Sequence, residues 1–135
     1  MTIAPGKHLD RDRDAMAREF YRRLAETGTA ATTRCARCGT TRFPPRSRCA
    51  DCDAPTEWIE LPRTGRLQAF TTQERALRYG APTVLVLVEL GDAVLPGVVD
   101  GPIEALTIGD EVELAAERVE ELGLSLCRFR PAARP

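Results

Sequence analysis

The sequence predicts a mainly β protein in which one N-terminal helix precedes a short cysteine-rich unit and a small five-stranded barrel. Apolar residues recur at helical spacing near the N-terminus, four cysteines fall within residues 33–61, and five strand-like segments follow residue 62. The alternation of strands and helices that builds a parallel sheet is missing from the pattern. We therefore expect three units: a helical segment over 1–32, a ribbon over 33–62 and a barrel over 63–135.

The first unit is expected to form a helix from Asp10 to Thr27. Aspartates at its start supply cap and first-turn negative charge, and Gly28 is a suitable stop. Met16, Phe20 and Leu24 recur every four residues and place apolar side chains on one face. Such a face most often packs on the chain's own core, and a partner protein is the alternative that the sequence leaves open.

Turn residues separate the strand-like segments of the last unit. Gly91-Asp92 is a two-residue hairpin signal, and Pro62 to Gly65 is expected to form a turn or hinge leading into the barrel. Five strands in so short a stretch favour a small closed barrel. The expected strands are Arg66 to Gln73, Pro82 to Leu90, Ala93 to Val99, Asp110 to Leu114 with continuation toward Val119, and Leu122 to Arg130.

The run from Val84 to Val88 is apolar on both faces of its strand. A strand of a small barrel buries only its inner face, so the outer face needs another cover. The N-terminal helix, the cysteine-rich unit and another polypeptide are the candidates. This need is the sequence's own indication of a partner.

Two Cys-x-x-Cys pairs dominate the second unit. Cys35 and Cys38 form the first pair, Cys49 and Cys52 the second, and ten residues separate them. This spacing is typical of a zinc ribbon in which four thiolates surround one ion. Two disulfides are the competing interpretation, and iron in a rubredoxin-like site is chemically possible, but paired spacing in a chain expected to be cytoplasmic favours zinc.

The residues after each pair bear on the local geometry. Gly39 follows the first pair, where a positive φ lets backbone amides turn toward sulfur, whereas Asp53 follows the second, so we expect a less regular second knuckle. Four thiolates leave no open position for substrate, so the expected role of the metal is structural. Cys127, the fifth cysteine, lies among apolar strand residues and is interpreted as a core side chain.

Composition excludes several classes of function. The 135 residues carry 19 basic and 20 acidic side chains, so no global field gathers nucleic acid or anionic lipid, and the longest apolar runs are far too short to span a membrane. No export signal is recognisable, so a cytoplasmic location is expected. His8 is the only histidine and is expected in a flexible lead-in, which leaves no residues for a catalytic triad or dyad. We expect a chain that is not catalytic alone.

Charge is nevertheless uneven along the chain. Residues 1–66 carry 13 basic and 9 acidic side chains, whereas residues 67–135 carry 6 and 11. Guanidinium groups in the ribbon could meet a coenzyme phosphate, a protein carboxylate or nucleic acid, and the last is disfavoured because the barrel is acidic and poor in aromatic residues. The ribbon arginines are Arg34, Arg37, Arg42, Arg46 and Arg48.

The order of these elements resembles one known family. Cys35-x-x-Cys38-Gly39 is followed by Phe43-Pro44-Pro45-Arg46 and Cys49-x-x-Cys52, and the barrel ends in Cys127-Arg-Phe-Arg-Pro131. This pattern is similar to the acyl-CoA-associated zinc-ribbon/OB-fold family, formerly a numbered family of unknown function, over nearly the whole chain.

The resemblance implies a rubredoxin-like zinc ribbon followed by an OB-fold barrel, in an accessory subunit of a thiolase-fold enzyme such as a thiolase, acyltransferase or aldolase. The partner would carry the catalytic residues, and this chain would help to shape the channel for acyl-CoA or a related substrate. The four cysteines match the family's ligands, and Arg46 is a candidate for contact with CoA phosphate or a partner carboxylate. A nucleic-acid-binding module and a small iron redox protein are the alternatives.

Overall fold

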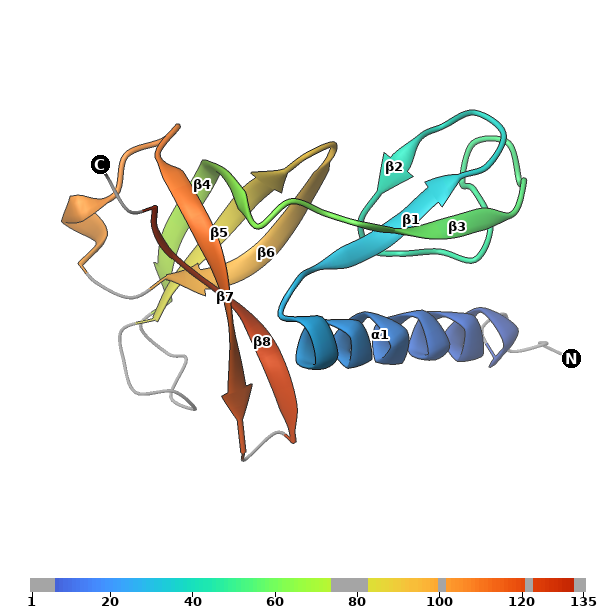
Figure 1. Ribbon diagram of the computed structural model, residues 1–135, viewed down its shortest axis with the longest axis horizontal. Coiled ribbons are helices and arrows are strands. Elements are labelled where there is room, and N and C mark those ends of the chain that lie inside the picture. The colour runs from blue at the N-terminus through green and yellow to red at the C-terminus, as the bar shows by residue number, and fades with distance from the viewer. Residues whose placement is uncertain (1–6, 74–82, 100–101, 121–122, 133–135) are drawn as a thin grey trace, which may run out of the picture.

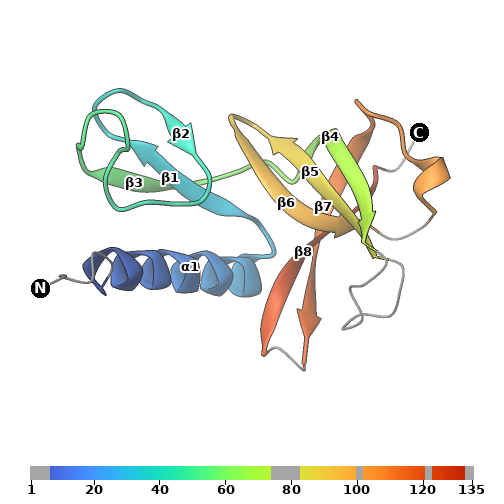
Figure 2. The same ribbon diagram turned by 180° about the vertical axis from the view of Figure 1, so that it is seen from behind.

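The computed structural model describes residues 7–73, 83–99, 102–120 and 123–132. One helix lies beside a small sheet, and both adjoin a separate barrel (Figure 1). Seen from behind, the helix again runs beneath the small sheet and ends beside the barrel (Figure 2). The predicted fold class, mainly β with an N-terminal helix and a closed five-stranded barrel, is confirmed.

Helix α1 runs from Lys7 to Thr27. It begins three residues before the expected start, so the expected cap at Asp10 is wrong, and His8 lies in the first helical turn rather than in a flexible lead-in. The expected C-terminal end is confirmed, because Gly28 adopts a φ of 70° and donates its N–H to the carbonyl of Leu24 at 2.9 Å. Within the described ranges, no helix combines the length and apolar character needed to cross a membrane.

The ribbon is a three-stranded antiparallel sheet in the order β2-β1-β3. Strand β1 (Ala31–Cys35) is its centre, β2 spans Thr41–Arg42 and β3 spans Thr56–Glu60. The two outer strands coincide with the short extended pieces expected near residues 42 and 57. The central strand was not predicted, because its sequence Ala-Thr-Thr-Arg-Cys lacks the apolar alternation of a strand.

The barrel closes in the order β4-β5-β6-β8-β7. Neighbouring strands are antiparallel except β6 and β8, which run parallel where the barrel closes. A short 3₁₀ helix, η2, precedes β7. The bounds are β4 Thr64–Gln73, β5 Thr83–Leu90, β6 Ala93–Val99, η2 Ile103–Ala105, β7 Glu111–Val119 and β8 Leu124–Pro131.

All five expected strands are present, and the expected hairpin between β5 and β6 is confirmed by the pairing of Leu90 with Ala93. Pro82 and Leu122, which were expected to open two strands, lie outside the described residues. The expected turn at Gly65 is wrong, because this residue lies inside β4 and pairs with Val112. A side chain there would stand 2.1 Å from the carbonyl oxygen of Glu89, so a close approach of β4 to β5, and not a turn, explains the glycine.

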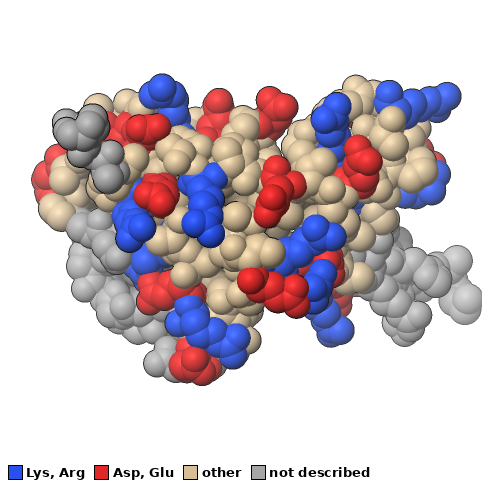
Figure 3. Space-filling view, viewed as in Figure 1, with Lys and Arg blue, Asp and Glu red and all other residues tan. Residues whose placement is uncertain are grey.

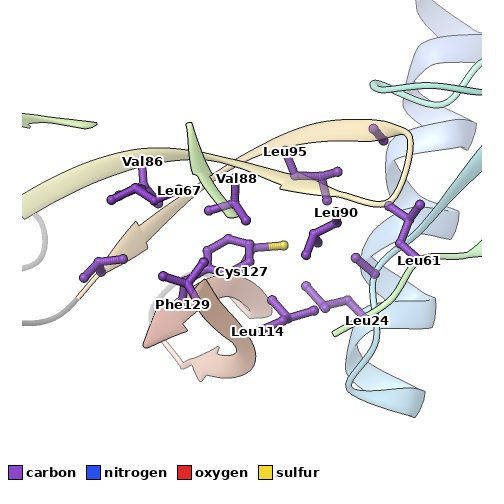
Figure 4. Packing of buried hydrophobic residues seen from close by; sticks show 14 of the residues in the cluster. Leu24, Leu61, Leu67, Val86, Val88, Leu90, Leu95, Leu114, Cys127 and Phe129 are labelled. Carbon is purple, nitrogen blue, oxygen red and sulfur yellow. The ribbon is translucent and has the colours of Figure 1, made fainter. Parts of the chain in front are cut away.

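One continuous core joins the helix to the barrel. Phe129 and Val88 are fully buried inside the barrel, and Leu24 of α1 and Leu61 of the linker belong to the same apolar cluster. Figure 4 shows Leu24 and Leu61 at the end of this cluster beside Leu90. The helix therefore covers the chain's own core, as its apolar periodicity most simply predicted.

Candidate metal centre

Local structure brings the four paired cysteines of the ribbon together. The first pair begins at the end of β1, and the second lies in the loop between β2 and β3. All four Sγ atoms lie within 4.8 Å of one another, with Cys35 to Cys52 at 3.3 Å and Cys38 to Cys49 at 3.7 Å. A tetrahedral ion with bonds of about 2.3 Å to sulfur separates its ligands by roughly 3.8 Å. The cluster thus has the size and donor set of a four-thiolate metal site.

The same distances argue against the disulfide interpretation. A disulfide bond joins two sulfur atoms at about 2.05 Å, and all five cysteines of this chain are free thiols. The short distances also join the two pairs to each other, as one shared ion requires. A metal fits this donor set better than oxidation does.

Both knuckles have the same backbone geometry. Gly39 has a φ of 76° and donates its N–H to the carbonyl of Cys35 at 3.1 Å, and Asp53 has a φ of 58° and donates its N–H to the carbonyl of Cys49 at 3.0 Å. Aspartate tolerates this left-handed conformation better than most residues. The expected irregularity of the second knuckle is therefore wrong for its backbone.

The first knuckle favours the thiolate form of its cysteines. The backbone N–H groups of Cys38 and Arg37 both point to the Sγ of Cys35 at 3.3 Å. The bond from Cys38 is the largest cause that lowers the pKa of Cys35 to about 6, and the hydroxyl of Thr40 likewise lowers the pKa of Cys38. Backbone donors that stabilise sulfur charge are what a cationic ligand set needs.

Cys52 titrates in the opposite direction. The backbone N–H of Ala54 lowers its pKa, but the neighbouring thiol of Cys35, burial and the other two thiols outweigh that bond and raise the pKa of Cys52 to about 11. Four sulfur atoms this close cannot all ionise without a cation between them. Positive charge at the centre of the cluster would remove this repulsion.

Two ion pairs hold the second knuckle in place. Arg42 of β2 pairs with Asp51, and Arg48 pairs with Asp53 at 3.1 Å between Nε and Oδ1. These pairs neutralise part of the basic patch expected over the ribbon. Arg34, Arg37 and Arg46 remain exposed. Figure 3 shows basic and acidic side chains interspersed on one face of the molecule, in line with the balanced net charge.

Arg46, the expected anion-binding residue, lies at the surface beside the ribbon sheet. Its backbone is fixed on both sides: its N–H donates to the hydroxyl of Thr33 at 2.8 Å, and its carbonyl accepts the hydroxyl of Thr56 at 2.6 Å. The preceding Phe43–Pro44 peptide bond is cis, and Pro45 is buried. The turn that carries the guanidinium is thus tied to β1 and β3, and its side chain projects from a firm base.

Cys127 occupies the position expected of it. The residue is buried in the barrel beside Leu114 and Phe129 (Figure 4). Desolvation raises the pKa of its thiol to about 12, so neither ionisation nor nucleophilic attack is favoured there. The acidic pairs Glu111/Glu113 and Glu120/Glu121 were expected on solvated faces; among the described residues, Glu111 and Glu120 are exposed and Glu113 pairs with Arg130 at 3.9 Å.

The outer face of β5 lacks the cover that the sequence called for. Leu87 is 41% exposed, and the cross-strand register places Ala69 of β4 and Pro96 of β6 directly beside it. Leu85, two residues earlier, shares this face with Val98 of β6. We call these five residues the outer strip. Helix α1 packs instead on the ribbon and on the β7–β8 side of the barrel, so the cover has to come from outside the chain.

Comparison with known families gives one match to the barrel half of the chain. A family model described as the C-terminal OB-fold domain of ChsH2 matches residues 58–117. The matched stretch includes β3 to β6 and most of β7.

Two curated relatives cover most of the chain. A DUF35 domain-containing scaffold protein of Methanocaldococcus jannaschii is 30% identical over 118 residues, which are 82% of this chain and 84% of the relative. A protein of the same description from Methanothermobacter thermautotrophicus is 29% identical over 110 residues, 76% of this chain and 83% of the relative.

Solved structures show the same arrangement. A chain of the Ltp2-ChsH2(DUF35) aldolase superposes with a TM-score of 0.74 and 28% identity over 85% of this chain and 94% of that one. A protein of unknown function from the DUF35 family of Sulfolobus solfataricus has the same fold, with a TM-score of 0.60 and 16% identity over 87% of this chain and 85% of that one. Similarity thus extends over the helix, ribbon and barrel together.

Proposed function

The chain belongs to the DUF35 family, and from that membership we propose that it is a non-catalytic accessory subunit that docks on a thiolase-fold enzyme. The partner would be a thiolase, acyltransferase or aldolase acting on acyl-CoA or a related acyl substrate. One observation carries the proposal: the superposition on a chain of the Ltp2-ChsH2(DUF35) aldolase, whose description pairs a DUF35 protein with a second component. The relatives described as scaffold proteins support the same role.

The outer strip is the surface we assign to docking. Leucine in contact with water is unfavourable, and a strip of apolar residues on one sheet face is typical of a protein interface. Placed against an enzyme, this face would exclude water at the rim of the substrate channel and help to enclose a thioester. The catalytic groups would belong to the partner.

Zinc is the metal we propose for the ribbon, with Cys35, Cys38, Cys49 and Cys52 as its ligands. Four thiolates complete the coordination of zinc, so the ion would fold the loops and take no part in chemistry. A unit of about 30 residues has too small a core to fold well by itself, and metal binding supplies the missing free energy. Arg46 is proposed to contact a CoA phosphate or a partner carboxylate beside this ribbon.

Docking can be tested by co-expression with a thiolase-fold enzyme encoded beside this chain. We expect the two proteins to co-elute in size-exclusion chromatography. Leu87→Asp should abolish co-elution, because a carboxylate would lose its hydration inside an apolar interface. Ile108→Asp is the matched control, since Ile108 is also exposed, at 58%, but lies in the turn before β7 and outside the outer strip.

The proposal fails if the wild-type proteins never co-elute and enzyme turnover is the same with and without this chain. Co-elution that survives Leu87→Asp but not Ile108→Asp would keep the accessory role and reject the outer strip as its surface. Circular dichroism of each variant would establish that the barrel is intact.

A further inference from the structure

A hollow of about 620 Å³ lies between helix α1 and the ribbon. Its volume falls in the range of small-molecule sites, roughly 300–1,000 Å³. The helix contributes one wall through Met16 and Ala17, and the turn that begins at Phe43 contributes the other. This cavity, which we call the helix–ribbon groove, is separate from the cysteine cluster and from the outer strip. Its lining includes none of their residues.

The floor of the groove is apolar and aromatic. The rings of Phe20 and Phe43 meet edge to face with centroids 5.3 Å apart, and Tyr21 packs on Phe20 at 5.2 Å. Phe20 is buried, whereas Phe43, Tyr21 and Met16 are half-buried and keep surface toward the groove. A flat ring could stack on such a surface with little rearrangement, because the aromatic contacts already fix the floor.

The polar part of the lining has one sign of charge. Arg13 of α1 and the two ribbon residues Arg42 and Arg46 line the groove, and among the described residues no carboxylate does. Arg42 is engaged by Asp51, but no salt bridge within the described part of the chain joins Arg13 or Arg46 to an acid. Guanidinium groups match phosphate in charge and in the geometry of their N–H donors.

We propose that the helix–ribbon groove binds a nucleoside phosphate, with the base on the aromatic floor and the phosphates between Arg13 and Arg46. The source could be the nucleotide end of CoA, which rests on the proposed function, or a free adenine nucleotide, which does not. An extended nucleic acid is less suited, because the barrel offers no comparable platform: Phe129 is fully buried and Phe70 half-buried, while Tyr79 lies outside the described residues.

The test is isothermal titration of the full, metal-loaded chain with CoA, ADP and inorganic phosphate. We expect both nucleotides to bind and phosphate alone to bind at least about tenfold more weakly, since it lacks a ring for the floor. Tighter binding of CoA than of ADP assigns the groove to the coenzyme; equal binding assigns it to free nucleotides. No measurable binding of either nucleotide overturns the proposal.

Matched variants place the ligand. Arg46→Ala and Arg13→Ala should each weaken nucleotide binding about tenfold or more, as expected for loss of a hydrogen bond to a charged group. Arg37→Ala removes the same charge from an exposed ribbon residue outside the groove and should leave affinity within about twofold. Ala17→Trp, at an exposed helix position in the lining, should block the groove.

Two further outcomes separate this proposal from its neighbours. Nucleotide binding that is equally weakened by Arg37→Ala would reflect general charge attraction and overturn the groove. A single-stranded oligonucleotide that binds more tightly than CoA in an Arg46-dependent way would replace the nucleotide by nucleic acid. Because these titrations need no partner, nucleotide binding without co-elution rejects only the accessory role, and co-elution without nucleotide binding rejects only the groove.

Discussion

The hydroxyl oxygen of Thr33 accepts the backbone N–H of Arg46 at 2.8 Å, so the central ribbon strand holds the turn that carries the exposed guanidinium. The neighbouring Thr32 donates its hydroxyl to the carbonyl of Arg42 at 2.5 Å. Both threonines are buried, at 0% and 4% exposure. Two polar side chains that satisfy the backbone of a loop from inside the fold explain why β1 carries threonine at its centre.

Thr33→Val is expected to destabilise the protein by about 1–3 kcal/mol, because valine keeps the shape but leaves the N–H of Arg46 without its acceptor. Urea unfolding followed by circular dichroism measures the change. Thr71→Val, at an exposed position of β4, is the control and should stay within about 0.5 kcal/mol of wild type. Equal stability of the two variants would show that the bond to Arg46 contributes nothing.

Removal of the metal is expected to unfold residues 33–61. A chelator, or Cys35→Ala, should lower the melting temperature and abolish dispersed NMR signals of the ribbon, since the thiolates repel one another without a cation. Elemental analysis should find one zinc per chain in a colourless sample. A coloured sample with iron would instead revive the rubredoxin-like alternative, and a melt unchanged by both treatments would contradict a structural metal.

Thiol titration is expected to divide the five cysteines into two classes. Cys127 should stay unmodified by iodoacetamide in the folded protein, because burial raises the pKa of its thiol to about 12. The four ribbon cysteines should become reactive as soon as the metal is removed. Mass spectrometry of digested peptides assigns the modified sites, and Cys127→Ala should leave the count of rapidly reacting thiols unchanged. Rapid labelling of Cys127 in the native chain would disprove its placement in the core.

Acid is expected to weaken helix α1 through Glu19. Its carboxylate accepts hydrogen bonds from Arg22 and Arg23 at 2.8 and 2.7 Å, and these bonds, that to Arg22 first, lower its pKa from 4.5 to about 2. A carboxyl whose folded pKa is depressed stabilises the fold above its unfolded pKa, and this contribution is lost as the pH falls from about 4.5 toward 2. Because the pairs are solvent-exposed, the effect should be small.

Glu19→Gln should therefore flatten the pH dependence of the melting temperature within that window and leave it parallel to wild type above pH 5. Glu57→Gln, at an exposed position of β3, is the control. Identical acid profiles for wild type and Glu19→Gln would contradict a contribution from these ion pairs.

The barrel was readable from sequence where a local signal decides the structure. Gly91-Asp92 marks a hairpin, and β6 begins and ends as predicted at Ala93 and Val99. Gly65 was misread because a glycine required by a close strand crossing looks the same in sequence as a glycine in a turn. Strand β1 was missed because its threonines are buried by tertiary hydrogen bonds rather than by apolar patterning.

The candidate sites divide in the same way. The cysteine spacing is local and predicted the cluster at Cys35, Cys38, Cys49 and Cys52. The helix–ribbon groove joins Arg13 to Arg46 across more than thirty residues, so only the packing of Phe20 on Phe43 brings its walls together. Sequence singled out Arg46 but gave no sign that Arg13 would face it.

The uncovered leucine at position 87 has a consequence for how the cell must make this protein. A chain produced in excess of its companion would present the outer strip to other copies of itself and to the quality-control machinery, which recognises such surfaces. Matched synthesis of the two subunits removes that hazard, and orphan molecules would be the first to precipitate or to be degraded.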